Sequence, residues 1–512
     1  MLGAFPLLST IIWLPIVGGS LLLMLRRMVP ERALQYLGLL LAAASVGLCV
    51  PLFQGFFLQT WQMQWVESLT WLPALGINYA LGVDGIAILL IALTCFMTLL
   101  VCIAIVESHI IGVNYLAVFL LMNGCMCGAF MALDSVLFYM FFEALLIPMF
   151  FIIGIWGGPN KLYATVKFFL YTFLGSIFFL AGIIYLHVKA SSLSIPLNES
   201  FAIATFQILP LNLIEQKWLF WAFVLAFGIK VPMWPVHTWL PDAHTEAPTA
   251  GSVILAAITL KMGGYAMLRF LLPVVPDACK IFAVAVIVLS LVAVVYIGFV
   301  AIVQQDMKRL VAYSSISHMG IVTLGIFVAA ILVTTPNGSA RAQMGLDGAI
   351  VQMISHGFIS GALFFCIGVL YDRMHSRLIS DYSGVATVMP KYAAFFMLFA
   401  MANVGLPGTS GFVGEFLVIM ATFQAKLWYA VAAASILILG AAYTLWMYKR
   451  VMFAEVVSSS VAALKDLTAH EIMLFTLLTA AILFVGIWPD ALLEYTQATV
   501  EHLVDQLSRS KL

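Results

Sequence analysis

Long apolar runs separated by short polar stretches make up almost the whole chain of 512 residues. A membrane-spanning helix needs about twenty apolar residues. On that criterion the pattern predicts about fourteen spans, near 5–26, 33–54, 82–106, 113–132, 135–156, 164–188, 217–233, 247–272, 281–302, 309–334, 347–371, 391–424, 427–454 and 470–489. The longer polar intervals are 55–81, 189–217 and 372–390. We therefore expect an all-α integral membrane protein in which residues 1–512 form one polytopic domain.

Composition agrees with this pattern. Hydrophobic residues make up 64% of the chain and charged residues 9%, whereas soluble proteins carry roughly a quarter charged residues. Lysine and arginine (23) balance aspartate and glutamate (23), which argues against nucleic acid as a partner. The expected partners are lipid and other membrane chains.

The sequence shows no binding motif for a cofactor or a metal ion. Its seven cysteines lie mostly inside apolar runs, in none of the spacings that bind zinc or an iron–sulfur cluster. It has no Walker loop, no glycine-rich dinucleotide fingerprint and no HExxH motif. If the chain belongs to a redox enzyme, we expect the electrons to travel through other subunits.

The distribution of lysine and arginine predicts the orientation. When the spans alternate, most of these residues fall on the side opposite the N-terminus, starting with Arg26 and Arg27. Positive residues favour the cytoplasmic side, so we expect the N-terminus outside and the first apolar run to be a retained helix. Lys308 and Arg309 are most simply anchors of this topology.

Six ionisable residues stand inside apolar runs, at depths near the middle of the membrane: Glu143, Lys230, Lys261, His318, His356 and Glu415. Each could instead serve only helix packing, with its polar group hydrogen-bonded to a neighbouring carbonyl. Left unpaired, the two lysines and two glutamates together would cost on the order of 10 kcal/mol. Because no single donor reaches across a bilayer, such a row is what a proton relay requires.

Helix-breaking residues accompany two of these charges. Pro232 and Pro235 follow Lys230, and the segment GLPGTSGFVGE around Pro407 ends at Glu415. Proline removes an amide donor and interrupts a helix. Broken helices at corresponding places in two halves are the pattern of inverted-repeat transporters, whose ion sites lie at the breaks.

Carboxylates near the ends of the spans have simpler explanations. Asp84, Glu107 and Asp134 lie where a solvated carboxylate or a charge at a helix N-terminus is common. Asp134 begins the run that carries Glu143, nine positions later. It is therefore also a candidate for proton uptake from the membrane surface.

Four stretches resemble the antiporter-like subunits of respiratory complex I, and among these the M-type subunits. They are KVPMWPVHTWLPDAHTEAPTAGSVILAAITLKMGGYAMLRF at 230–270, DMKRLVAYSSISHMG at 306–320, ISHGFISGALFFCIGVLYDRMHSR at 354–377 and NVGLPGTSGFVGEF at 403–416. The resemblance implies fourteen helices with helices seven and twelve broken. It also implies two inverted five-helix repeats, near 113–272 and 281–454, flanked by helices 1–3 and 14.

The resemblance also implies roles for the buried residues. Glu143 and Lys230 match the family's coupled pair, and Lys261 matches its central relay lysine. His318 matches the relay histidine, and His356 lies in a matching motif. Glu415 matches the terminal group near the outer exit, where the L-type and N-type subunits usually carry lysine.

On this resemblance, the chain is expected to move protons in a bacterial plasma membrane beside L-type and N-type neighbours. FMN, iron–sulfur clusters and quinone are expected in partner subunits, with no redox centre on this chain. Rival hypotheses are a subunit of a multi-subunit cation/proton antiporter or of a membrane-bound hydrogenase, and a scaffold subunit that translocates nothing.

Overall fold

The computed structural model describes residues 6–108, 112–456 and 458–512. Within them, twelve helical stretches are long and apolar enough to cross a membrane, which confirms the predicted class. In lipid, every backbone amide and carbonyl must be satisfied within the chain, and helices achieve this locally. Ten of the stretches are single helices: α1 (Leu7–Leu25), α2 (Glu31–Gln54), α3 (Gly85–Ser108), α4 (Val113–Met131), α7 (Lys161–Ser192), α14 (Pro276–Ile302), α15 (Met307–Leu332), α16 (Gly338–Met374), α20 (Leu427–Met452) and α22 (Ala469–Ile487).

The other two stretches contain irregular turns. One consists of α5 (Ser135–Ala144) and α6 (Leu146–Trp156), which meet at Leu145. The other runs from Thr249 to Val274 through α11 (Thr249–Ile254), a π-helical turn at Leu255–Thr259, α12 (Leu260–Ala266), a second π-helical turn at Met267–Leu271 and α13 (Leu272–Val274). Single π turns inside α-helices occur frequently at functional sites.

Two further apolar segments are broken, where the prolines and glycines predicted it. Helix α9 (Leu213–Lys230) ends at Lys230, and α10 (Trp239–Glu246) follows after a turn. Helix α18 (Pro390–Val404) is separated from α19 (Ser410–Ala425) by residues 405–409. The total of fourteen spans and the inverted pairing of two halves stay predictions.

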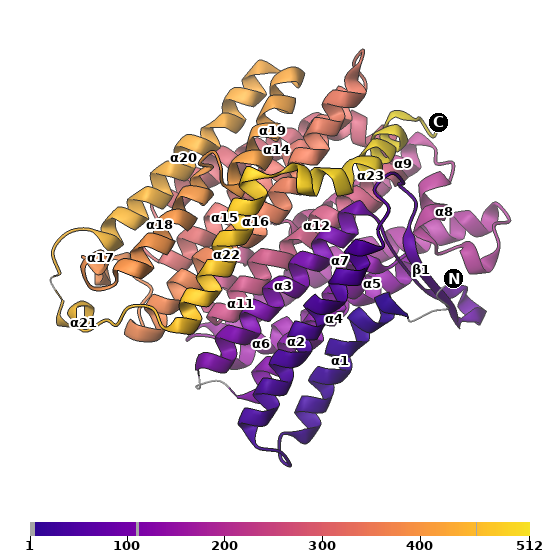
Figure 1. Cartoon of the computed structure of the whole chain (residues 1–512). Helices are drawn as coiled ribbons and strands as arrows, with labels where there is room; N and C mark the ends of the chain where they lie inside the picture. The colour runs from indigo at the N-terminus through magenta and orange to yellow at the C-terminus, as the bar shows by residue number, and fades with distance from the viewer. Residues whose placement is uncertain (1–5, 109–111, 457) are drawn as a thin grey trace.

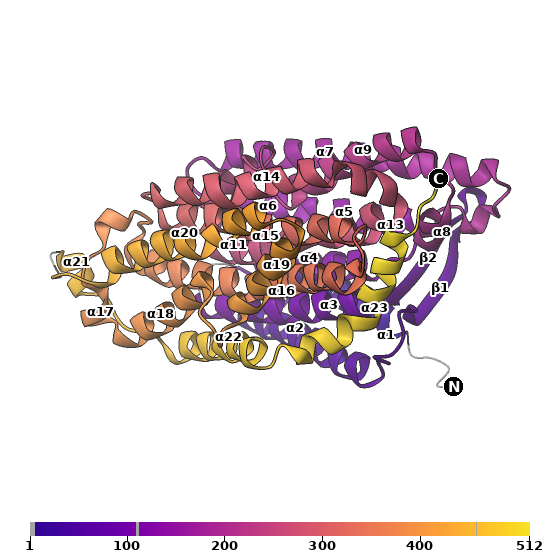
Figure 2. The same cartoon turned by 90° about the horizontal axis from the view of Figure 1, so that it is seen from above.

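The bundle has two distinct faces. Figures 1 and 2 both place strands β1 (Gln64–Leu72) and β2 (Ile77–Val83), helix α8 (Ile203–Ile208) and helix α23 (Asp490–Ser508) at one end of the long helices. They place α17 (Val385–Val388) and α21 (Ser459–Ala462) at the other end. We call these ends the hairpin face and the opposite face. Three 3₁₀ turns complete the structure, at Pro73–Leu75, Leu197–Glu199 and Ile379–Asp381.

The β-hairpin lies in the polar interval 55–81, where the sequence predicted no regular element. Its two strands pair antiparallel with register shifts at both ends. Glu67 of β1 accepts hydrogen bonds from the Leu8 amide at 2.7 Å and the Ser9 amide at 3.1 Å. These are unpaired donors at the start of α1, so the hairpin caps that helix.

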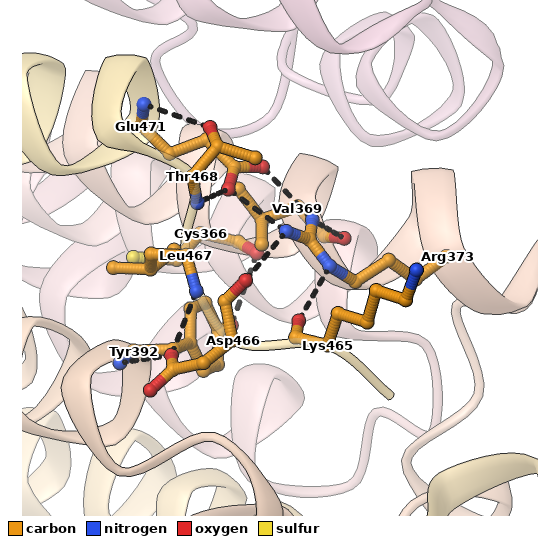
Figure 3. A network of polar contacts seen from close by, with 9 residues as sticks. All are labelled: Cys366, Val369, Arg373, Tyr392, Lys465, Asp466, Leu467, Thr468 and Glu471. Carbon is orange, nitrogen blue, oxygen red and sulfur yellow. Dashed lines mark hydrogen bonds and ion pairs between the residues drawn. The ribbon is translucent and has the colours of Figure 1, made fainter. Parts of the chain in front are cut away.

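At the opposite face, a polar network joins the ends of α16, α18 and α22 (Figure 3). Both terminal nitrogens of Arg373 donate to the Glu471 carboxylate at 2.8 Å. Asp466 accepts from the amides of Lys391 and Tyr392 at 3.0 and 3.1 Å. A bidentate arginine contact of this kind fixes orientation as well as distance.

The most deeply buried spans are α4, the Thr249–Val274 stretch, α15 and α16, whereas fewer than half of the residues in the apolar windows of α2, α7 and α22 are buried. The buried spans therefore form the centre of the bundle. Six of the seven cysteines are buried and all seven are free thiols, as expected for small apolar side chains in a membrane bundle.

Candidate functional site

Lys261 lies in α12, directly after the first π-helical turn, and its side chain is fully buried. Its ammonium group donates to the carbonyl of Ala256 within that turn. It also lies 2.7 Å from Nδ1 of His356 on α16. A buried lysine therefore has two nearby acceptors, one fixed in the backbone and one a titratable ring.

The row continues from His356 to Glu415. The rings of His356 and His318 lie 5.9 Å apart between their centres. Nδ1 of His318 on α15 lies 2.6 Å from Oε1 of Glu415 on α19. Lys261, His356, His318 and Glu415, each at most 3% exposed, thus form one line of contacts, which we call the polar row. The sequence placed these residues at similar depth, and the structure brings them together.

Glycines at the α18–α19 break place Glu415 in the polar row. Gly405 has φ +82°, a left-handed conformation that favours glycine. A Cβ atom on Gly414 would lie 2.6 Å from the amide nitrogen of Gln352, so only glycine permits this approach of α16 and α19. Gln352 is thereby close enough to donate to Glu415 at 3.1 Å.

Tyr443 on α20 adds a contact that sequence reasoning missed. Its hydroxyl lies 3.3 Å from Nε2 of His318, the nitrogen that does not face Glu415. In a neutral imidazole one ring nitrogen donates and the other accepts. Tyr443 and Glu415 together therefore bias which nitrogen of His318 carries the proton. A tyrosine in an apolar run gave no signal, because most such tyrosines only fill space.

Glu143 and Lys230 are arranged differently from the polar row. Glu143 is half-buried near the end of α5, and its Oε1 has no hydrogen-bond partner among the described residues. Lys230 is 3% exposed, with its ammonium 4.6 Å from the centre of the Phe142 ring. The two charges interact through space, and no ion pair within 4.0 Å joins them among the contacts of the described residues.

The break after Lys230 is stabilised locally. The amide of Met233 donates to the Gly228 carbonyl at 2.7 Å. The indole of Trp239 donates to the Ile229 carbonyl at 2.9 Å. The carbonyls freed by the break are thus partly satisfied by the chain itself, as buried backbone groups require.

His244 on α10 is a second residue that sequence reasoning missed. It is fully buried and stacked on Phe364, with ring centres 4.7 Å apart. Neither ring nitrogen has a hydrogen-bond partner among the described residues, and the ring interacts electrostatically with Lys261 and Lys308. The residues LPDAHTEAP that contain His244 belong to the stretch 230–270 that carries the family resemblance. The sequence did not show that the ring is buried, because His244 lies between a predicted break and the start of the next predicted span.

Asp134 forms the contacts of a helix cap at the hairpin face. Its carboxylate accepts from the amides of Val136 at 2.9 Å, Leu137 at 3.2 Å and Asn78 of β2 at 3.1 Å. Burial raises the pKa of Asp134, against the effect of these three hydrogen bonds. A role in proton uptake stays a prediction.

The structure decides between the two explanations for Asp84. Its carboxylate is 1% exposed and accepts from the Ala87 amide at 2.9 Å at the start of α3, so the charge at a helix N-terminus is confirmed and the solvated carboxylate is not. Lys308 is 3% exposed, and its ammonium donates to the Ala247 carbonyl at 2.7 Å; its role as an anchor of the topology stays a prediction. Local composition did not show that neighbouring helices cover both groups. The side chain of Glu107 lies outside the described part of the structure.

The fold and site together define a polytopic helical membrane protein with two broken helices and a buried row of ionisable side chains. The family model of the NADH:quinone oxidoreductase/Mrp antiporter membrane region matches residues 132–440. Subunit M of the NADH-quinone oxidoreductase of Rhodobacter capsulatus is 46% identical over 506 residues, 97% of this chain and 96% of the relative. Chain 4 of the NADH-ubiquinone oxidoreductase of Arabidopsis thaliana is 39% identical, over 97% of each chain.

Solved structures agree. A chain of respiratory complex I from Thermus thermophilus with bound NADH superposes with a TM-score of 0.87 at 30% identity, covering 98% of this chain and 99% of that one. The Mrp complex from Dietzia sp. DQ12-45-1b contains a chain with a TM-score of 0.79 at 21% identity, which covers 98% of this chain and 55% of that one and indicates a shared fold alone. The chain belongs to the subunit M/chain 4 family of NADH:quinone oxidoreductases.

Proposed function

We propose that this chain is a proton-translocating membrane-arm subunit of an NADH:quinone oxidoreductase, in which protons move along the polar row. The observation that carries the proposal is the line of contacts from Lys261 to Glu415, made by side chains of four helices. A merely structural role would not require adjacent lysine, histidines and glutamate in the centre of a membrane bundle, where each ionised group is costly.

In the proposed mechanism the Glu143–Lys230 pair controls the polar row through charge. Lys230 interacts with Glu143 through space rather than through a short ion pair, so the interaction changes when the charge around either residue changes. When the electrostatic interaction between Glu143 and Lys230 weakens, Lys230 releases its proton toward Lys261. His244, which lies on α10 after the break at Lys230 and interacts with Lys261, supplies a ring that accepts and passes on the proton, with bound water for the remaining step.

From Lys261 the proton moves to His356, then to His318, and then to Glu415. The first and last of these steps span 2.7 and 2.6 Å between heavy atoms, within hydrogen-bond reach. The approach of the two histidine rings needs only a small ring motion or one water. Release follows at the hairpin face, which we assign to the outer side of a bacterial plasma membrane because fewer lysines and arginines lie there. Asp134 contacts β2 at that same face, so this direction of transport gives it no part in proton uptake, which starts from the opposite face.

We further propose that redox chemistry takes place in partner subunits that hold FMN, iron–sulfur clusters and quinone, with L-type and N-type chains as membrane neighbours. This chain's own residues would then bind and move protons.

The test is NADH-driven proton uptake in inverted membrane vesicles that carry Glu143→Ala, compared with native vesicles at equal assembly of the complex. We expect proton uptake and quinone reduction to collapse together. Glu199→Ala is the matched control, because Glu199 is an exposed glutamate at the hairpin face, and it should leave both rates unchanged. Normal pumping by Glu143→Ala would favour the scaffold hypothesis instead.

The subunits that co-purify with the chain separate the remaining rivals. Flavin and iron–sulfur partners are expected. Small membrane partners alone would favour the cation/proton antiporter, and a nickel-containing partner would favour the hydrogenase.

A further inference from the structure

A buried ion pair lies on the helical stretch that carries Lys261, nearer the hairpin face. Tyr265 and Arg269 follow Lys261 at intervals of four residues, and eight residues of helix span about 12 Å. Arg269 pairs with Asp84 at 2.6 Å, with side chains 12% and 1% exposed. Nε of Arg269 donates to the Tyr265 hydroxyl at 3.2 Å, and that hydroxyl donates to the Phe130 carbonyl at 2.9 Å. The guanidinium group is therefore held on two sides.

A cavity of about 110 Å³ borders this pair. Asp84, Tyr265 and Arg269 line it, together with Trp61 and with Thr499 and His502 of α23. Since one water takes up about 30 Å³, the cavity has room for about three. Its polar lining gives such waters hydrogen-bond partners, so water from the hairpin face can reach the ion pair.

This arrangement creates a short route out of the polar row. From Lys261 to the cavity, only Tyr265 and Arg269 carry polar side-chain groups along that stretch of helix. A proton that left Lys261 in this direction would reach the hairpin face without passing His356, His318 or Glu415. A proton from that face could also return by it, which would dissipate the gradient.

We propose that Arg269, anchored by Asp84 and Tyr265, is an electrostatic barrier that closes this short route. The inference rests on the proposed function and adds to it the means by which protons are kept on the row. Arginine stays protonated in proteins, so it repels an excess proton that approaches from either side, as an arginine in a selective pore does. Both oxygens of the Asp84 carboxylate are engaged, one by Arg269 and the other by the Ala87 amide.

The barrier predicts which substitutions open the route. Arg269→Gln removes the fixed positive charge and leaves Asp84 as an unpaired buried carboxylate, which can then take up and release protons. Asp84→Asn/Arg269→Gln removes the titratable carboxylate as well. We therefore expect both variants to leak protons several-fold faster than the native protein, because both lack the positive charge, and the single variant to be the faster of the two, because its freed carboxylate can also carry protons.

The measurement is passive proton uptake by liposomes that contain the purified complex, driven by a potassium diffusion potential without NADH. Lys189→Gln is the matched control, because it removes the Lys189–Glu215 ion pair of 2.7 Å at the same face, away from the cavity. Arg269→Lys keeps the charge and should stay close to native. If Arg269→Gln does not assemble, Tyr265→Phe, which removes one anchor, should still raise the leak.

Two results would overturn the barrier. A native leak in the double variant beside a fast leak in Arg269→Gln would mean that the freed carboxylate conducts the protons and that the positive charge is no barrier. If every variant that assembles takes up protons passively at the native rate, Arg269 is not a barrier. Because the assay uses no NADH, its result does not depend on whether Glu143→Ala stops pumping, so the two proposals fail separately.

Discussion

The two parts of the charged system are joined in different ways. Lys261, His356, His318 and Glu415 are linked by contacts that include hydrogen bonds of 2.7 and 2.6 Å. Glu143 and Lys230 interact through space only. The first arrangement suits proton transfer, which needs short steps between heavy atoms. The second suits control, because a through-space interaction responds to charges that appear elsewhere.

The difference follows from where the side chains sit on their helices. Lys230 is the last residue of α9, at a break, whereas Glu143 is half-buried on α5 near the irregular turn at Leu145. Lys230 is 3% exposed, whereas Glu143 is only half-buried. Lys261, by contrast, lies in a stretch that is buried along its whole length. The Glu143–Lys230 pair and the polar row are thus separate parts of one bundle.

Breaking the row at Lys261 should have the largest effect. Lys261→Met keeps the length and apolar volume of the side chain but removes the proton carrier and the contact with His356. We expect NADH-driven proton uptake and quinone reduction to fall at least about tenfold, equivalent to about 1.4 kcal/mol. Stopped-flow measurement of vesicle acidification would test this, with Lys280→Met at the hairpin face as the control. If Lys261→Met keeps more than half of the native rate of proton uptake, protons do not move along the polar row through Lys261.

A double-mutant cycle on Glu143 and Lys230 should show the next largest effect. Each single variant, Glu143→Gln and Lys230→Met, leaves the other charge buried without its partner, so each should slow pumping several-fold. If the two act as one electrostatic pair, the double variant should be no slower than the slower single one. Turnover and proton uptake at equal assembly would be compared at several salt concentrations. Additive losses would show that the residues act independently.

Tyr443→Phe should have the smallest effect. It removes the hydroxyl 3.3 Å from Nε2 of His318 and keeps the ring. A hydrogen bond of this kind is worth about 0.5–1.5 kcal/mol, so we expect pumping to slow about two- to fivefold with the complex fully assembled. The pH dependence of the rate should also shift, because the tautomer of His318 is less constrained. An unchanged pH profile would mean that Tyr443 only fills space.

Much of the architecture was predictable because apolar length and helix-breaking residues act locally. The run before Lys230 ends at the prolines that follow it, and the run before Gly405 ends at the glycine-rich segment. The six buried ionisable residues stood out for the same reason, since a charge in an apolar run is conspicuous. The β-hairpin was not predictable, because its strands pair across a turn in a polar, Trp-rich interval that shows no clear alternation of apolar and polar residues.

His244 and Tyr443 show the limit for the site. Neither residue carries a fixed charge that would be anomalous in its run, so each reads as an ordinary residue of its helix. Their importance comes from neighbours on other helices: Phe364 and the charges around His244, and Nε2 of His318 beside Tyr443. Asp84 shows the same limit, because its position at the start of a span allowed either a solvated carboxylate or a helix cap, and only the structure shows that Arg269 and α23 cover it.

The sequence by itself determined that this is a helical membrane protein, where two helices break, and which ionisable groups stand inside apolar runs. These properties depend on runs of residues along one helix and on the cost of placing charge in lipid. Only the tertiary structure decided which of those groups touch, that Glu143 and Lys230 interact at a distance while Lys261 to Glu415 form a row, and that Asp84, Tyr265 and Arg269 line a water-sized cavity. Contacts between helices depend on how their faces meet, and in this bundle glycines such as Gly414 allow two backbones to approach closely enough to set them.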